Sequence, residues 1–329
     1  MTGFLFESFL HALVDAVLVG VSLRVWGIVR AEPRQRFLSL IVILPALTPT
    51  LFRMQGFGLG WPVFYRGALF DGSRWLRVEL FHIPLFRWVF FCLTGLCVAV
   101  FLFQELLPIF LNFRQSKRMV TSIPLDHQGK KIPLEELAIP PIKELDGLDI
   151  RVLPDHEADI SSISWSRPSI LIGERFLKIL DQEELRAVIA HEIAHLGMDR
   201  KPFMILMYAF RMLGFFNPVV LGAFRFVAHE EECLCDDRAV WLTSSDPLTL
   251  AGALEKLSQI HFCEGPGLAG WEQHGDISRN LSAVGLREQL FKRISRLRLK
   301  TYDPDGPGYW PELVVVALGC LAFSFGVTG

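Results

Sequence analysis

The sequence has almost no net charge. Its 33 lysines and arginines stand against 35 aspartates and glutamates, which leaves −2 at pH 7. A chain without a net positive charge has no electrostatic support for a nucleic-acid partner. Cysteines are also few: six occur among 329 residues, and Cys92, Cys97 and Cys320 lie in apolar runs. This scattered distribution gives no disulfide framework and is compatible with a reducing cytosolic face.

Apolar residues are abundant instead. Hydrophobic residues make up 51% of the chain, with 27 phenylalanines, and the mean hydropathy is +0.35. These values exceed those of a soluble enzyme, so we predict a membrane protein. The first span has no basic segment before it and contains acidic residues, which excludes a cleaved signal peptide. The predicted spans are residues 4–29, 37–52, 86–113 and 313–327, of which the second and fourth are shorter than the ~20 residues that cross a bilayer.

Lysines and arginines set the predicted orientation. They cluster after the first span, after the third span and before the fourth, and such clusters favour the cytoplasmic side. Four arginines between the second and third spans argue against this orientation. The sequence therefore predicts a membrane domain with three transmembrane helices over residues 1–115, a cytoplasmic domain over 116–310 and a C-terminal transmembrane helix over 311–329.

The H-E-x-x-H pattern formed by His191, Glu192 and His195 is the most informative feature of the chain. A helix is expected there independently, because Asp181 and Glu184 form a capping box and neither glycine nor proline interrupts the residues that follow. On a helix, His191 and His195 lie one turn apart on one face and can bind one Zn²⁺. Glu192 can then act as general base toward water. Paired surface histidines are the alternative.

A catalytic zinc site needs a third protein ligand and an open position for water. The candidate segment is the acidic run at residues 229–237, which has the sequence HEEECLCDD and is predicted to begin another helix. Glu230, Glu231 and Glu232 lie on different faces of such a helix and are alternative ligands. The C-x-C pair in the same run points its two thiols apart, which argues against a cysteine ligand.

The pattern H-E-x-x-H, followed by about thirty-five residues and then E-x-x-C-D, resembles the BlaR/MecR-type membrane metallopeptidases, which are gluzincins. It resembles the HtpX-type enzymes more loosely. The resemblance extends over roughly residues 148–300, and over the N-terminal spans in arrangement only. Three further features fit it: the Phe216-Asn217-Pro218 step, the predicted strand pair at residues 164–172 and the Arg293-Ile294 step.

The resemblance implies a mostly α membrane protein with a zincin-like α+β metalloprotease domain inserted between transmembrane helices. It places the chain in a bacterial-type inner membrane, multi-pass, with the protease domain in the cytoplasm. It also implies one Zn²⁺ per chain, held by His191, His195 and Glu232, with Glu192 as general base. Asp236, one turn after Glu232, would be the carboxylate that orients a ligand imidazole.

Two apolar segments carry polar interruptions. Residues 202–227 contain the Asn-Pro step, and the residue before a proline avoids helical geometry, so we predict two helices. They would form a membrane-dipping hairpin, with a buried globular hairpin as the alternative. Glu7, His11 and Asp15 form a stripe inside the first span. Ionisable groups rarely face lipid, so this stripe is expected to face the helix bundle.

The substrate is expected to bind beside a strand. A protease holds its peptide extended, and an exposed strand edge does so through backbone hydrogen bonds. Ser161, Ile163 and Trp165 are the candidate residues of this edge, with an ordinary sheet strand as the alternative. His229 and Arg293 are candidates for oxyanion or substrate contacts.

The predicted function is zinc-dependent endoproteolysis at the cytoplasmic membrane face, acting on a protein or peptide in regulatory or signalling cleavage. The alternatives are housekeeping degradation of damaged membrane proteins and a non-proteolytic, zinc-stabilised signalling protein. Glu192 argues against the last, because a structural site needs no base. BlaR/MecR receptors continue into an extracellular sensor, whereas this sequence ends at Gly329. A stimulus is therefore expected through the lipid bilayer, a membrane sensor partner or a segment beyond the sequence.

Overall fold

The computed structural model describes most of the chain and divides it into two compact units. The described residues are 2–54, 85–102, 149–153, 161–163, 169–197, 201–263, 277–299 and 307–328. Within them the protein is mostly helical, as predicted. The first unit comprises Met1–Met119, Pro202–Glu231 and Gly306–Gly329, and the second comprises Val120–Lys201 and Glu232–Asp305.

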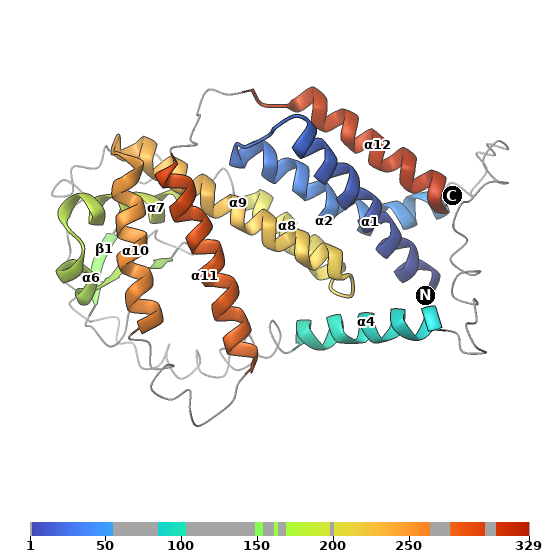
Figure 1. Ribbon diagram of the computed structural model, residues 1–329, viewed down its shortest axis with the longest axis horizontal. Coiled ribbons are helices and arrows are strands. Elements are labelled where there is room, and N and C mark those ends of the chain that lie inside the picture. Colours follow the sequence, from blue (N-terminus) through green and yellow to red (C-terminus); the bar gives the residue numbers. More distant parts are fainter. Residues whose placement is uncertain are drawn as a thin grey trace. The chain divides into compact units, whose positions relative to one another are not determined.

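The first unit is a bundle of apolar helices. In it α1, α2 and α12 pack against one another (Figure 1). Its core includes Val19 of α1, Phe37 and Val42 of α2, and Cys320 of α12. The helices of this unit are α1 (Thr2–Val25), α2 (Ala31–Met54), α4 (Leu85–Phe101), α8 (Lys201–Leu213), α12 (Trp310–Thr328) and the N-terminal part of α9 (Pro218–Thr243).

One helix among the described residues is long and apolar enough to cross a membrane. It is the Phe4–Val25 part of α1, with 22 residues. The apolar stretches Arg87–Ala99, Pro202–Leu213 and Trp310–Gly326 are shorter. The predicted second span is helical as part of α2 but does not meet this criterion, and residues 103–113 of the predicted third span lie outside the described residues.

The polar stripe of α1 faces the bundle, as predicted for two of its three residues. His11 and Asp15 are fully buried, whereas Glu7 is half-buried. The ring Nδ1 of His11 lies 2.6 Å from the Thr48 hydroxyl oxygen of α2. This hydrogen bond satisfies a buried imidazole between two packed helices.

The Asn-Pro step separates α8 from α9, so the two helices predicted over residues 202–227 are present. The Asn217 side-chain oxygen accepts a hydrogen bond from Val219 N at 3.1 Å and caps the new helix. Pro218 then occupies its first position, where a missing N–H is tolerated. Gly214 begins the turn after α8, and it lets Val220 approach closely, because a Cβ there would lie 2.7 Å from Val220 Cγ1. That this hairpin dips into a membrane stays a prediction.

The second unit contains a small sheet of three strands. These are β1 (Asp149–Leu153), β2 (Ser161–Ile163) and β3 (Ser169–Gly173), and β3 overlaps the predicted strand pair at residues 164–172. Their order is β1-β3-β2, with β1 parallel and β2 antiparallel to β3. The strands are short, so the unit is formed mainly by α6 (Glu174–Ile179), α7 (Gln182–Leu196), α10 (Pro247–Cys263), α11 (Ile277–Arg298) and the C-terminal part of α9.

The predicted capping box at the start of α7 is confirmed. The Asp181 carboxylate accepts from Glu184 N at 2.8 Å, and Asp181 N donates to the Glu184 carboxylate at 2.9 Å. Glu184 also accepts from Lys256 Nζ of α10 at 2.6 Å. The cap therefore both starts the helix and ties it to its neighbour.

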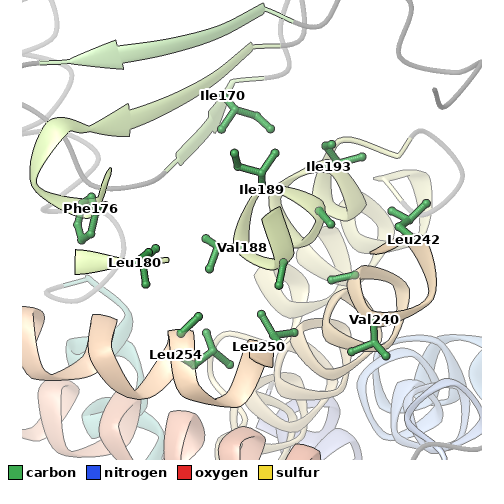
Figure 2. Packing of buried hydrophobic residues seen from close by; sticks show 14 of the residues in the cluster. Ile170, Phe176, Leu180, Val188, Ile189, Ile193, Val240, Leu242, Leu250 and Leu254 are labelled. Carbon is green, nitrogen blue, oxygen red and sulfur yellow. The ribbon is translucent and has the colours of Figure 1, made fainter. Parts of the chain in front are cut away.

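The apolar face of α7 is packed between the sheet and α10. Figure 2 shows Ile170 of β3 over Ile189 of α7, and Leu250 and Leu254 of α10 on the other side of the helix. Each such side chain stabilises the fold by roughly 1.5–3 kcal/mol when fully buried. This packing fixes the helix that carries the H-E-x-x-H residues.

Candidate metal site

Two imidazoles and one carboxylate converge between α7 and α9. His191 and His195 lie one turn apart on α7, with their Nε2 atoms 3.2 Å apart. Glu232 of α9 places one carboxylate oxygen 3.6 Å from His191 Nε2 and the other 3.5 Å from His195 Nε2. The Glu232 side chain is 38% exposed, so solvent reaches the donors. Within the described part of the chain, these three residues form the one cluster with donor atoms close enough to hold a metal ion.

The separations of the three donors are close to those that a tetrahedral zinc ion needs. Zinc binds imidazole nitrogen at about 2.0–2.1 Å and carboxylate oxygen at about 2.0–2.2 Å, which places neighbouring ligand atoms roughly 3.3–3.5 Å apart. The two imidazole nitrogens lie 3.2 Å apart, and the two Glu232 oxygens lie 3.6 Å from His191 and 3.5 Å from His195, one oxygen to each ring. Counted with one ligand atom per residue, the three donors lie within 4.8 Å of one another, so a small closure would bring them to zinc distances. Two histidines and one glutamate, with a fourth position left open, are a donor set typical of catalytic zinc sites.

Each imidazole is supported by a buried residue of α9. The Nδ1 atom of His191 lies 3.0 Å from an Asp236 carboxylate oxygen, off the direction of the ring N–H, so the contact is an ion pair rather than a well-formed hydrogen bond. The Nδ1 atom of His195 lies 3.4 Å from Cys235 Sγ. Contacts at Nδ1 orient the ring and leave Nε2 free to bind a metal.

Arg293 of α11 joins the two carboxylates of the site. Its guanidinium donates two hydrogen bonds to Asp236, at 2.8 and 2.6 Å, and a third to Glu232 at 2.8 Å. A bidentate pair of this kind fixes the geometry of a carboxylate as well as its charge. With 11% of its side chain exposed, Arg293 is a buried cation that offsets two neighbouring anions.

The charges of the site keep both carboxylates ionised. Burial alone would raise the pKa of Asp236, but Arg293 and His191 lower it to about 2. Burial would likewise raise the pKa of Glu232, whereas its contacts with His191 and His195 and the charge of Arg293 lower it. Burial opposes a charge on His191, yet Asp236 and Glu232 raise its pKa to about 9. In the metal-free site the two carboxylates are therefore ionised, and the charges of Arg293 and His191 balance them.

Glu192 adjoins a donor on α7, and β2 packs against the same helix. Glu192 follows His191 on α7 and is half-buried. Strand β2, which contains Ser161 and Ile163, packs against α7. Among the described strands it pairs with β3 alone and lies at the edge of the sheet, while Trp165 falls outside the described residues.

The three candidate glutamates of α9 have different partners in the structure. Glu230 accepts a hydrogen bond from Arg34 at 2.7 Å and Glu231 accepts one from Gln35 at 2.7 Å, both on α2. Only Glu232 of the three contacts the histidines. The other candidate on this helix, a histidine at position 229, is half-buried, and its contact with a substrate stays a prediction.

The sequence predicts neither of two supporting contacts. Its C-x-C pair raises Cys235 only as a possible ligand and not as a hydrogen-bond partner of His195, and Arg293 is predicted only as an oxyanion or substrate contact and not as a partner of the site carboxylates. The local sequence carries no signal for either contact, because the partners of Arg293 and of Cys235 lie on other helices.

Comparison with known proteins agrees with this geometry. Residues 161–247 match the family model described as BlaR1 peptidase M56, a range that includes the three donors. Over 132 residues the chain is 30% identical to the plastoglobule-localized metallopeptidase 48, chloroplastic, of Arabidopsis thaliana. That alignment covers 35% of this chain and 36% of the plant protein. No solved structure matches the chain. Both matches support a metal-dependent peptidase.

Proposed function

We propose that this chain is a zinc-dependent endopeptidase that cleaves a protein or peptide at the cytoplasmic face of a membrane. The observation that carries the proposal is the convergence of His191, His195 and Glu232, with Glu192 in the H-E-x-x-H frame. A structural zinc site needs ligands but no base. The presence of Glu192 therefore favours catalysis over a zinc-stabilised signalling protein.

Each side chain of the site has a distinct chemical role. Zn²⁺ bound by the two histidines and Glu232 would supply a Lewis acid toward water and toward the scissile carbonyl. Glu192 accepts the proton of the attacking water and delivers it to the leaving amine. Asp236 and Cys235 orient the two imidazoles, and Arg293 holds Glu232 in place.

The edge of β2 is the proposed place for the peptide. A peptide added to a sheet edge is held by main-chain hydrogen bonds, so its binding makes little demand on sequence. Ser161 and Ile163 lie on this edge strand, which packs against the helix that carries the histidines. This arrangement supports an endopeptidase that accepts an extended segment within a longer chain.

The exterior of the first unit supports a membrane location. Besides the Phe4–Val25 span, α8 exposes large apolar side chains, including Ile205 at 67% and Leu213 at 62%. A soluble protein rarely exposes a contiguous apolar surface of this kind, whereas lipid accepts it. We therefore propose a multi-pass protein of a bacterial-type inner membrane, with the α8–α9 hairpin in contact with lipid and the protease domain in the cytoplasm.

Regulated cleavage is proposed because the matching family model is of the BlaR1 type. A membrane sensor partner would then supply the stimulus. The test compares the cleavage products of membrane and cytosolic proteins in cells that carry the parent protein or its Glu192→Gln variant. Cleavage of one or a few proteins by the parent alone supports regulation. Cleavage of many damaged membrane proteins by the parent alone supports housekeeping degradation. No difference between the two peptide sets rejects the peptidase.

A further inference from the structure

The first unit carries an arginine stacked on an exposed indole. Arg36 lies in the second turn of α2, and its Cζ is 4.1 Å from the centre of the Trp310 ring at the start of α12. Arg36 Nη1 also donates to the Gly308 backbone oxygen at 3.5 Å, and Arg30 Nη1 donates to that of Pro307 at 3.4 Å. Trp310 nevertheless remains 57% exposed. A cation and an aromatic face are therefore held together at the surface of this end of the bundle.

The charges around this stack leave an excess of one cation. Arg36 and Arg30 both form ion pairs with Glu32, one to each carboxylate oxygen, and the two arginine side chains are 24% and 21% exposed. Arg24 in the last turn of α1 and Glu312 in the first turn of α12 add one charge of each sign. This end of the bundle therefore favours an anion over a cation.

Trp310 also begins an exposed apolar stripe along α12. Val314 and Leu318 follow it at intervals of four residues and are 54% and 60% exposed. Residues four apart lie on one face of a helix, and with a rise of about 1.5 Å per residue these three residues, the α12 stripe, extend over about 12 Å. Val316 and Cys320 of the same helix are buried in the core of the bundle. The α12 stripe thus faces away from the bundle.

We propose that Arg36 and Trp310 form a binding site for the phosphate of an anionic phospholipid, whose acyl chain lies along the α12 stripe. A guanidinium can donate two parallel hydrogen bonds to phosphate oxygens. An indole is favoured at the height of the lipid headgroups, where its ring meets both polar and apolar groups. An acyl chain on the stripe removes exposed apolar surface from water. The inference rests on the proposed membrane location.

The test measures lipid binding by native mass spectrometry of the full-length protein in detergent. The added lipid is an equimolar mixture of phosphatidylglycerol and phosphatidylcholine with the same acyl chains, and the parent should retain phosphatidylglycerol preferentially. Arg36→Gln should weaken this preference roughly fivefold, the effect of one arginine at an anionic membrane surface. Trp310→Ala should also weaken it, whereas Trp310→Phe keeps an aromatic ring and should retain most of it. Arg87→Gln is the matched control, because it removes one exposed arginine from α4 of the same unit.

The variants separate a specific site from a general effect of charge. Parent-like preference in both Arg36→Gln and Trp310→Ala overturns the inference, and so does an equal loss in Arg87→Gln. If Arg36→Gln fails to fold, Trp310→Ala and Trp310→Phe decide the question, since Trp310 is more than half exposed. A lipid-free dimer of the parent would overturn the inference in favour of a second copy on the stripe. The membrane location is tested separately: release of the parent from cell membranes by alkaline carbonate would reject that location itself.

Discussion

Cys235 Sγ lies 3.4 Å from Nδ1 of His195, and the corresponding ring nitrogen of His191 lies 3.0 Å from the carboxylate of Asp236. Two consecutive residues of α9 thus support the two histidines of α7. The thiol is a weak hydrogen-bond acceptor and carries no charge in its protonated form. The two imidazoles are therefore held by groups of different strength.

The contact of Cys235 predicts how its variants behave. Cys235→Ser keeps a hydrogen-bond acceptor at the ring and should retain near-parent zinc affinity. Cys235→Ala removes it and should weaken zinc binding by about 10-fold, the lower end for such contacts. Competition with a chelator of known affinity measures both. A thiolate-to-Co²⁺ charge-transfer band in the parent that disappears in Cys235→Ser would show that the sulfur is itself a ligand.

Zinc content should follow the three converging donors. The purified protein is expected to hold about one zinc per chain, and His195→Ala or Glu232→Ala should lose most of it. Glu192→Gln should keep its zinc, because its side chain is not among the converging donors. Elemental analysis after gel filtration gives the ratio. Glu255→Ala, at a half-exposed surface ion pair, is the matched control. Full zinc in Glu232→Ala would mean that another residue is the third ligand.

Proton transfer by Glu192 predicts a large loss of turnover. Removing a general base typically lowers the rate about 10²–10⁴-fold, so Glu192→Gln should be folded and zinc-loaded but slower by at least this factor. Asp236→Asn should be milder, with a loss of roughly 10–100-fold in activity or metal affinity. Cleavage of a native target by each purified variant provides the rates. Equal rates for Glu192→Gln and the parent would exclude its role as base.

Arg293 should contribute most to the free energy of unfolding when metal is absent. Arg293→Ala leaves buried Asp236 without its bidentate partner, and breaking such a pair typically lowers the free energy of unfolding by about 3–5 kcal/mol. Added Zn²⁺ should restore part of this loss, because a ligand that binds the folded state stabilises it. Urea unfolding with and without zinc measures both effects. The control Arg298→Ala, in a half-exposed pair with Glu255, should change stability by about 1 kcal/mol or less.

The predicted orientation can be tested by labelling from outside intact cells. Basic clusters place the segment around Ser258 in the cytoplasm and the loop around Gly60 outside. A membrane-impermeant thiol reagent should therefore reach a cysteine introduced at Gly60 and miss one introduced at Ser258. Both should react after the cells are opened, which controls for burial. The reverse pattern would reject the topology, and with it a cytosolic substrate.

The sequence alone determined the features that depend on near neighbours. The capping box of Asp181 and Glu184 starts α7, and the regular helix then places His191 and His195 on one face. The step at Pro218 likewise ends one helix and begins the next. Each of these depends on contacts within a few residues, so the local pattern was sufficient to predict it.

Only the tertiary structure decided which glutamate meets the histidines. Glu230, Glu231 and Glu232 are chemically identical neighbours, but the first two contact residues of α2, almost two hundred residues away in sequence, and the third contacts the histidines of α7. The contacts of Cys235 and Arg293 were also decided by the tertiary structure, because their partners lie on other helices. A local pattern specifies a helix and its faces, but the packing of buried charges against distant partners specifies which face meets the metal site.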